Sequence, residues 1–185
     1  AFVAQQEIGY LTEGENFALI SLSKAREKEV ESGYLQTDID DDGKFEKIVF
    51  TFFSPEWFSY YTNIYTPDGE KIIVDGTLWK AFVDDLTGDG IKELIVTTLS
   101  GHVSIANIFS YENGHLEKIP FYDENGTELQ ETMLVTSLEV SFEDLNGDGV
   151  KEIIMPIRNY GNEFIELIYY YHWNGRGFML YNKKI

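Results

Sequence analysis

The sequence predicts an all-β fold made of three four-stranded units that follow a short N-terminal segment. Three observations lead to this prediction. An acidic nine-residue loop occurs three times, at residues 38–46, 85–93 and 144–152. A run rich in Ile, Val and Leu follows each loop, and an Asp-Gly or Asn-Gly turn comes later in each unit. Repeats at this spacing indicate repeated supersecondary units, and such turns between β-prone runs are a strong hairpin signal.

Each unit is expected to contain two hairpins, because each has one acidic loop and one of the turns Asp68-Gly69, Asn113-Gly114 and Asn174-Gly175. We predict repeat 1 over 34–80, repeat 2 over 81–139 and repeat 3 over 140–185, in one structural domain. The polar stretch 123–131 reads as an inserted loop or an extra hairpin within repeat 2. The strands are expected at 34–37, 47–53, 59–65 and 71–75, then 81–83, 93–98, 103–111 and 116–121, then 140–142, 152–157, 164–171 and 178–182.

Residues 1–33 do not match the repeat and are expected to form a cap segment that covers a sheet edge. A helix over part of 16–32, ended by Gly33, is favoured because Lys24/Glu27 and Lys28/Glu31 would form i,i+3 pairs. A strand over 17–23 is the alternative.

Composition narrows the classes of function. The chain has 185 residues and a formal net charge of −18, which disfavours nucleic acid and anionic membranes as partners. It has no Cys and three His, so thiolate sites and disulfides are excluded and a multi-histidine zinc site is not expected. No apolar run is long enough to predict a membrane-spanning helix. The first residues, Ala1-Phe2-Val3-Ala4, fit either a processed secreted protein or an excised segment.

The acidic loops have the pattern of a site for a hard cation. Ca²⁺ takes about six to eight oxygen ligands in a flexible cage, and alternate residues of a tight loop can turn their side chains to one centre. Counted from its first aspartate, each loop has oxygen-bearing side chains at positions 1, 3, 5 and 9, a glycine at position 6, and a carbonyl to offer at position 7. The candidate ligands are Asp38, Asp40, Asp42, Lys44 and Glu46; Asp85, Thr87, Asp89, Ile91 and Glu93; and Asp144, Asn146, Asp148, Val150 and Glu152.

The loops differ from an EF-hand, which needs a glutamate at position 12, where this chain has Val49, Val96 and Met155. We therefore expect Ca²⁺ at up to three loops that close β-hairpins, with loops 1 and 3 preferred because Thr87 is a poor ligand. Mg²⁺ is a poorer fit because it seldom takes an all-protein cage. The alternative is that these loops are solvated, metal-free turns.

The pattern Asp-x-Asp/Asn-x-Asp-Gly-x-x-Glu, followed by an apolar strand, resembles the FG-GAP or VCBS repeat. The resemblance covers residues 34–185 and implies four-stranded propeller blades with Ca²⁺ in the loop between the first two strands. Thr87 at position 3 and glutamate at position 9 depart from the family pattern, as does the absence of its Phe-Gly and Gly-Ala-Pro signature, which favours the bacterial form. Three blades cannot close a typical ring, so an incomplete propeller capped by 1–33, or one completed by self-association, is expected.

These features together predict a Ca²⁺-binding module, secreted or on the cell surface, that binds protein or carbohydrate and is not an enzyme. Trp57 and Trp173 are candidate ligand contacts, although packing between sheets is the simpler role for such residues. A polysaccharide-active enzyme or its accessory domain is one alternative, and a metal-free structural or inhibitory protein is another.

Overall fold

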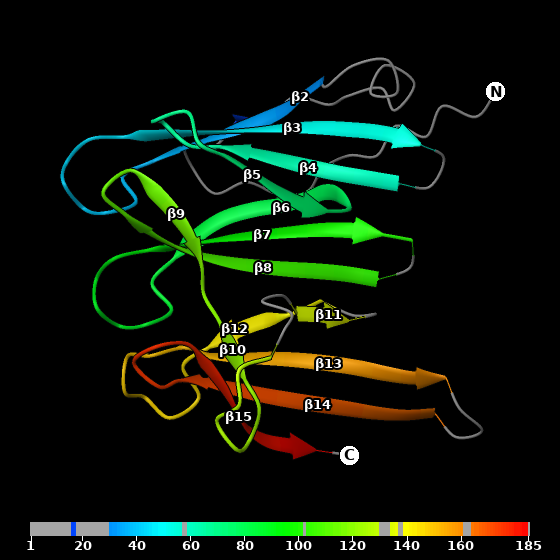
Figure 1. Ribbon diagram of the computed structural model, residues 1–185. Helices are drawn as coiled ribbons and strands as arrows, with labels where there is room; N and C mark the ends of the chain where they lie inside the picture. The colour runs from blue at the N-terminus through cyan, green and yellow to red at the C-terminus, as the bar shows by residue number, and fades with distance from the viewer. Residues whose placement is uncertain are drawn as a thin grey trace.

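Three open β-sheets lie one above another in the computed structural model (Figure 1). The structure describes residues 16–17, 30–56, 59–101, 103–129, 134–136, 139–160 and 164–184. These residues contain no helix, and the all-β class predicted from the sequence is confirmed.

Sheet 1 contains five strands in the order of the chain, each antiparallel to the next. Four of them confirm the strands predicted for the first unit. The fifth is a two-residue strand that pairs with the edge of β2. The strands are β1 (Asn16–Phe17), β2 (Val30–Thr37), β3 (Glu46–Glu56), β4 (Ser59–Tyr65) and β5 (Lys71–Asp75).

The helix expected within 16–32 is wrong at both ends of that range. Residues 16–17 are β1, and β2 begins at Val30, so the last part of the range pairs with β3 instead. At this end of the range, pairing with β3 supplies backbone partners to the strand. Residues 18–29 lie outside the described part of the chain.

Sheet 2 has the strand order β11-β8-β7-β6, and β9 also pairs with β8. The two partners share one edge of β8: β11 lies beside its first half and β9 beside its second half. The strands are β6 (Thr77–Asp84), β7 (Glu93–Ser100), β8 (Val103–Glu112), β9 (His115–Lys118) and β11 (Leu134–Thr136).

Sheet 3 has the order β10-β15-β14-β13-β12, in which β10 runs parallel to β15. The strand predicted at 116–121 is therefore two strands: β9 ends at Lys118, and the chain crosses to sheet 3 as β10. Pro120 has no N–H to continue a ladder, while its carbonyl accepts the N–H of Phe178 at 3.0 Å. The strands are β10 (Phe121–Tyr122), β12 (Ser141–Glu143), β13 (Glu152–Tyr160), β14 (Phe164–Trp173) and β15 (Phe178–Lys184).

The insertion after β10 is a turn organised by one aspartate. The Asp123 Oδ1 atom accepts the N–H groups of Asn125 and Thr127 at 2.9 and 2.8 Å. A single antiparallel bridge between Tyr122 and Glu128 closes the turn. Its described part is thus a tight loop, and the remaining residues of the predicted stretch 123–131 lie outside the described range.

Two apolar cores hold the sheets together, and sheet 2 contributes to both. In β7, Leu94 and Val96 pack toward sheet 1, while Ile95 between them packs toward sheet 3. This explains the uninterrupted apolar run, because a strand buried on both faces has no reason to alternate. Fully buried residues include Ile48, Phe50, Ile64 and Phe109 in the first core and Ile108, Ile153 and Phe178 in the second.

Candidate functional site: three acidic loops on one edge

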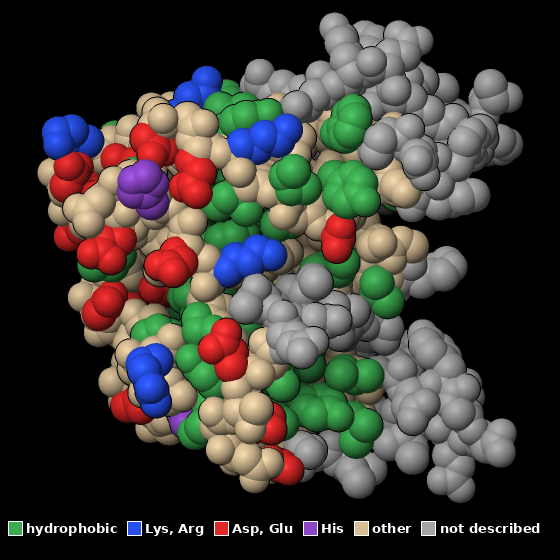
Figure 2. Space-filling model, in the orientation of Figure 1, with side chains coloured by type: hydrophobic (Ala, Val, Ile, Leu, Met, Phe, Trp, Pro, Cys, Tyr) green, Lys and Arg blue, Asp and Glu red, His purple; other side chains and the backbone are tan. Residues whose placement is uncertain are grey.

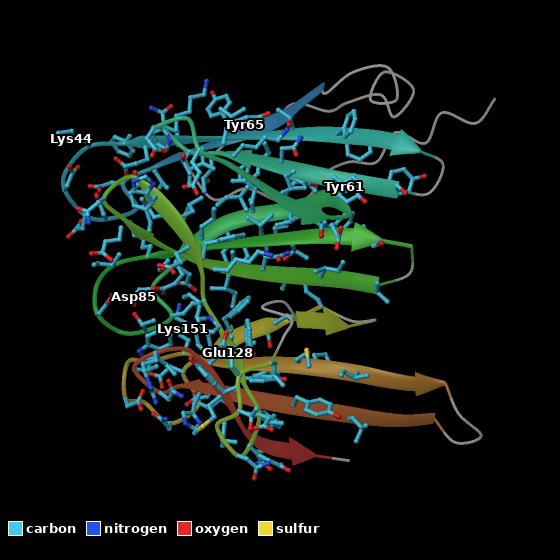
Figure 3. The ribbon with its side chains drawn as sticks, in the orientation of Figure 1. Lys44, Tyr61, Tyr65, Asp85, Glu128 and Lys151 are labelled. Carbon is cyan, nitrogen blue, oxygen red and sulfur yellow. The ribbon has the colours of Figure 1, made fainter. Side chains whose placement is uncertain are left out.

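The three acidic loops lie along one edge of the stack, at the left in Figure 1. Loop 1 (38–46) connects β2 to β3, loop 2 (85–93) connects β6 to β7, and loop 3 (144–152) connects β12 to β13. Figure 3 shows Lys44, Asp85 and Lys151 along this edge and Tyr61 toward the opposite one. Acidic side chains also gather along it in Figure 2. The repeat seen in the sequence is therefore a row of neighbouring loops.

The glutamate at position 9 has the same hydrogen bond in every loop. Its Oε2 atom accepts the backbone N–H of position 2, at 3.0 Å for Glu46 and Ile39, 2.8 Å for Glu93 and Leu86, and 2.9 Å for Glu152 and Leu145. This carboxylate thus closes each loop across its base. Each glutamate therefore has at most one carboxylate oxygen, Oε1, left to bind a cation. The sequence pattern did not reveal this hydrogen bond.

Two further hydrogen bonds occur in all three loops. The carboxylate at position 1 accepts the N–H of the glycine at position 6, at 2.9, 3.0 and 3.0 Å. The carboxylate at position 5 accepts the N–H of position 7 at 2.8 Å in each loop. These bonds turn the acidic side chains of positions 1 and 5 toward the inside of the loop.

The loop backbone enters the left-handed region twice, at positions 4 and 6. Gly43, Gly90 and Gly149 at position 6 have φ values of 84°, 89° and 88°. Position 4 has a φ of 76° at Gly88, 81° at Gly147 and 59° at Asp41. Only position 6 was assigned this role from the sequence, although glycine at position 4 of loops 2 and 3 was a visible signal. Asp41 adopts the left-handed backbone conformation, which is unfavourable for most residues other than glycine.

Loop 1 has the most open arrangement for a cation. Asp38, Asp40 and Asp42 each offer one carboxylate oxygen, and these three atoms lie within 4.8 Å of one another. Asp38 Oδ1 is buried and has no hydrogen-bond partner among the described residues. In loops 2 and 3 the equivalent oxygen accepts the N–H of position 4, at 2.7 and 2.6 Å. A buried carboxylate oxygen without a donor costs free energy that a bound cation would offset.

Asp42 in loop 1 forms an ion pair with the side chain of Lys44. Its Oδ2 atom lies 2.6 Å from Lys44 Nζ, and this contact lowers the pKa of Asp42. The lysine ammonium is exposed and can leave the carboxylate without being buried elsewhere. Lys44, whose carbonyl was a candidate ligand, thus also supplies a side chain that competes with a metal ion.

Loop 2 has a buried acid. Glu93 is only 3% exposed, and burial, aided by the nearby Asp89 and Asp85 carboxylates, raises its pKa to about 7. Thr87 Oγ1 is buried without a hydrogen-bond partner among the described residues. The second loop therefore also has an unsatisfied oxygen at position 3, although a hydroxyl is a weaker ligand than a carboxylate.

Loop 3 is closed by its own hydrogen bonds. Asp144 accepts three backbone N–H groups, from Gly147, Asp148 and Gly149, and these bonds lower its pKa. Asn146 donates to Glu152 Oε1 at 3.0 Å and accepts from Asp148 N at 2.8 Å. A cation here would have to replace bonds that already exist, so loop 1 fits a metal better than loop 3.

Lysines at position 8 join each loop to the one before it. The N–H of Lys92 donates to the Ile39 carbonyl at 3.1 Å, and its Nζ donates to the Asp38 carbonyl at 3.0 Å. Lys151 repeats the first bond to the Leu86 carbonyl at 3.0 Å, and its Nζ lies 2.6 Å from Asp84. The loops are therefore mechanically connected, which sequence analysis missed because the partners are far apart in the chain.

Of the two tryptophans that were candidate ligand contacts, Trp57 lies outside the described residues. Trp173 is half-buried: it packs on Phe178 with ring centroids 5.4 Å apart and lies against the second core. It also lines an open hollow of about 460 Å³ beside loop 3. The other lining residues are Leu145, Asn146, Asp148, Val150, Glu152, His172 and Tyr181.

Comparison with known proteins leaves the class open. No protein-family model matches the chain, and no curated protein matches it. Among the residues that the structure describes, no helix is both long and apolar enough to cross a membrane. The assignment of function accordingly depends on the geometry of the loops.

Proposed function

We propose that the chain is a Ca²⁺-binding β-repeat module of the FG-GAP/VCBS type, with its principal metal site in loop 1. The observation that carries the proposal is the convergence of Asp38, Asp40 and Asp42 within 4.8 Å, with Asp38 Oδ1 buried and unpartnered among the described residues. Three carboxylates at this separation repel one another in the absence of a cation. All-oxygen ligands in a flexible loop favour Ca²⁺.

Bound Ca²⁺ would stiffen the loop edge rather than take part in a reaction. Asp38 is a ligand through its side chain, and its carbonyl accepts the Lys92 Nζ–H from loop 2. A cation in loop 1 would therefore fix the residue on which loop 2 rests. In this proposal the three stacked sheets act as blades of an incomplete propeller, and the ordered edge presents a surface to a partner.

The hollow beside loop 3 supports a role in binding protein or carbohydrate. It combines the aromatic side chains of Trp173, His172 and Tyr181 with the polar groups of Asn146 and Asp148. Flat aromatic faces beside hydrogen-bonding groups suit a sugar ring or a protein side chain. The proposal places the module outside the cell or on its surface, where Ca²⁺ modules bind with dissociation constants of about 10⁻⁴–10⁻³ M.

Calorimetric titration of chelator-treated protein with Ca²⁺ tests the metal site. We expect heat of binding and a rise in melting temperature, with about 2.7 kcal/mol of stabilisation at 100 times the dissociation constant of one site. Asp38→Asn and Asp42→Asn should each weaken binding at least tenfold. Glu128→Gln, which changes an exposed acid in another loop, is the matched control. If millimolar Ca²⁺ gives neither heat nor a melting shift, loop 1 is not a Ca²⁺ site.

A metal-free structural role is the second candidate, since loops 2 and 3 satisfy most of their own polar groups. The two candidates differ in the effect of Asp40→Asn. If the loops work without metal, this change only relieves repulsion and should stabilise the protein equally with and without Ca²⁺. If loop 1 binds Ca²⁺, Asp40→Asn should lower stability when Ca²⁺ is present.

A further inference from the structure

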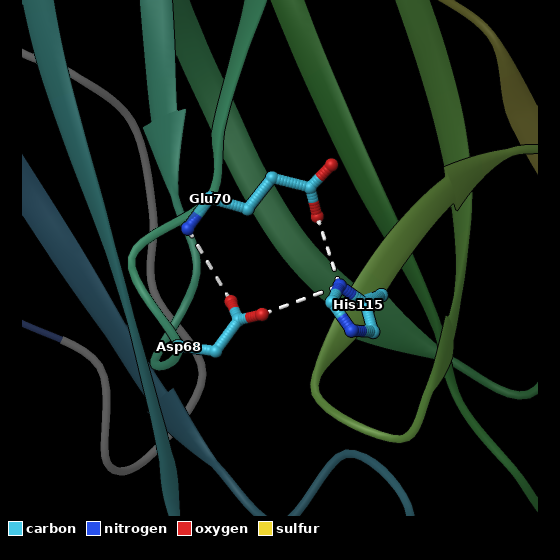
Figure 4. A group of neighbouring side chains, drawn as sticks. All are labelled: Asp68, Glu70 and His115. Atoms are coloured by element: carbon cyan, nitrogen blue, oxygen red, sulfur yellow. Dashed lines mark hydrogen bonds and ion pairs between the residues drawn. The ribbon is translucent and has the colours of Figure 1, made fainter.

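A second group of metal-ligating side chains, made of residues outside the three acidic loops, lies where the later turns of sheets 1 and 2 meet (Figure 4). Asp68 and Glu70 belong to the turn between β4 and β5, and His115 begins β9. His115 Nδ1 lies 3.2 Å from Asp68 Oδ2 and 3.5 Å from Glu70 Oε2. The three ligand atoms lie within 4.8 Å of one another, and all three side chains are exposed. A cation can therefore enter from solvent.

The two separations are close to the spacing of neighbouring ligand atoms around a metal ion. Both are longer than the about 2.7–2.9 Å that is usual for charge-assisted N–H···O bonds. Zn²⁺ binds nitrogen and oxygen ligands at about 2.0–2.1 Å in a tetrahedron, which puts neighbouring ligand atoms about 3.3–3.4 Å apart. The observed 3.2 and 3.5 Å lie on either side of that spacing.

The Asp68 carboxylate is held in place by the Thr66 hydroxyl and by the backbone N–H of Glu70. Its Oδ1 atom accepts the hydroxyl of Thr66 and the N–H of Glu70, the latter at 3.3 Å. Thr66 is buried and also accepts the Glu70 N–H at 3.0 Å. These bonds leave Oδ2 directed at His115. Hydrogen bonds that orient a ligand carboxylate in this way are a regular feature of metal sites.

We propose that Asp68, Glu70 and His115 form a site for a borderline divalent cation, Zn²⁺ above all, that joins sheet 1 to sheet 2. An imidazole nitrogen is an ordinary ligand for Zn²⁺, whereas Ca²⁺ takes oxygen ligands. Three protein ligands leave a fourth position for water or a partner's side chain. Glu112 and Glu117 line a hollow beside His115 and add negative charge that attracts a cation. The site shares no ligand with the Ca²⁺ site proposed for loop 1.

The test is a Zn²⁺ titration of the full chain in saturating Ca²⁺, followed by nitrogen NMR of the histidine rings. The chain has only three histidines, so each ring can be assigned. We expect the Nδ1 signal of His115 to shift with Zn²⁺ at micromolar to submillimolar concentration, while His102 and His172 stay unchanged. Calorimetry should show one Zn²⁺ site that His115→Asn weakens at least tenfold and Glu70→Gln weakens several-fold.

His172→Asn, a histidine change in sheet 3, is the matched control and should leave Zn²⁺ affinity unchanged. Circular dichroism of each variant checks the fold, which a change at an exposed side chain should leave intact. The proposal is overturned if His115 does not respond to Zn²⁺, or if His115→Asn binds Zn²⁺ as tightly as the wild type. Asp38→Asn separates the two proposals, because it should weaken Ca²⁺ binding in loop 1 at least tenfold and leave Zn²⁺ binding at this site unchanged.

Discussion

Lys151 of loop 3 contacts both carboxylate oxygens of Asp84 at 2.6 Å, and so ties sheet 3 to the last residue of β6 in sheet 2. Both side chains are about one-third exposed. The same lysine donates its backbone N–H to Leu86 at 3.0 Å. One residue therefore supplies two of the polar contacts across this junction, and the side-chain contact can be removed without changing the backbone one.

Lys151→Met should destabilise the protein by about 1–2 kcal/mol, because it removes a charge-assisted contact that is partly shielded from water and leaves Asp84 unpaired. Chemical denaturation at neutral pH measures the change. Lys44→Met is the control, since it removes a lysine–aspartate contact of the same 2.6 Å length at a far more exposed site. Equal losses for the two variants would mean that the Lys151 contact contributes no more than a surface pair.

Gly88→Ala should cost more stability than Gly147→Ala, although both glycines occupy position 4 with φ values of 76° and 81°. A Cβ on Gly88 would lie 3.0 Å from the Gly149 carbonyl oxygen in the next loop, whereas a Cβ on Gly147 meets nothing within 4 Å. Backbone strain alone costs about 1 kcal/mol in each variant. The difference in unfolding free energy between them reports the contact between loops 2 and 3. If that difference is absent, the loops do not press on one another in solution.

Stability in the absence of metal should fall as the pH rises from about 4.5 to about 7, because Glu93 ionises more easily in the unfolded chain. The pKa of Glu93 is raised from 4.5 to about 7 by burial. Its contribution is thus fully present below the unfolded pKa and is lost as the pH passes through the folded one. At about 1.4 kcal/mol per pKa unit, the loss is on the order of 3 kcal/mol at most.

Glu93→Gln should remove this part of the pH dependence, since the amide oxygen can still accept the Leu86 N–H and has no charge to bury. Denaturation curves at pH 5 and pH 8 in chelator measure it. Glu128→Gln, an exposed change of the same kind, should leave the pH dependence as it is in the wild type. A Glu93→Gln curve that keeps the full slope would contradict the buried, proton-binding state of Glu93.

Lys44→Gln should raise the Ca²⁺ affinity of loop 1 by about two- to fivefold, because the lysine ammonium no longer competes for Asp42. The effect is modest since the pair is exposed and screened by solvent. Calorimetry at low ionic strength measures it, with Lys80→Gln, which makes the same charge change away from the loop, as control. An equal gain in both variants would point to overall charge rather than to the contact with Asp42.

Local sequence patterns predicted the hairpins and the loops well, because both depend on residues that are close together in the sequence. Asn-Gly and Asp-Gly turns, apolar runs and the spacing of acids all act within a few residues. Pairing between distant segments was not predictable in this way. The parallel pairing of β10 with β15 depends on where Phe121 finds an apolar surface, and that surface belongs to sheet 3.

The same difference between local patterns and distant contacts applies to the candidate site. The acids at positions 1, 3 and 5 of loop 1 were predicted and lie together. The bond of Glu46 across the base of the loop was not predicted, because a carboxylate that suits a metal equally suits a backbone N–H. The cluster of Asp68, Glu70 and His115 was also missed, since its members come from two turns whose contact only the stacking of sheets creates.

The residue at position 2 of each acidic loop is buried to a very different extent in the three loops, and Leu145 of loop 3 is the exception. The residues at its position in loops 1 and 2, Ile39 and Leu86, are 0% exposed, whereas Leu145 is 49% exposed. In a row of stacked units each unit is held chiefly by its neighbours, so cooperativity travels through the shared faces. Sheet 2 packs against a sheet on both sides, and sheet 3 packs against one. Hydrogen exchange should therefore show local opening first in the strands around loop 3 and last in β7. The three sheets would then unfold in a fixed order.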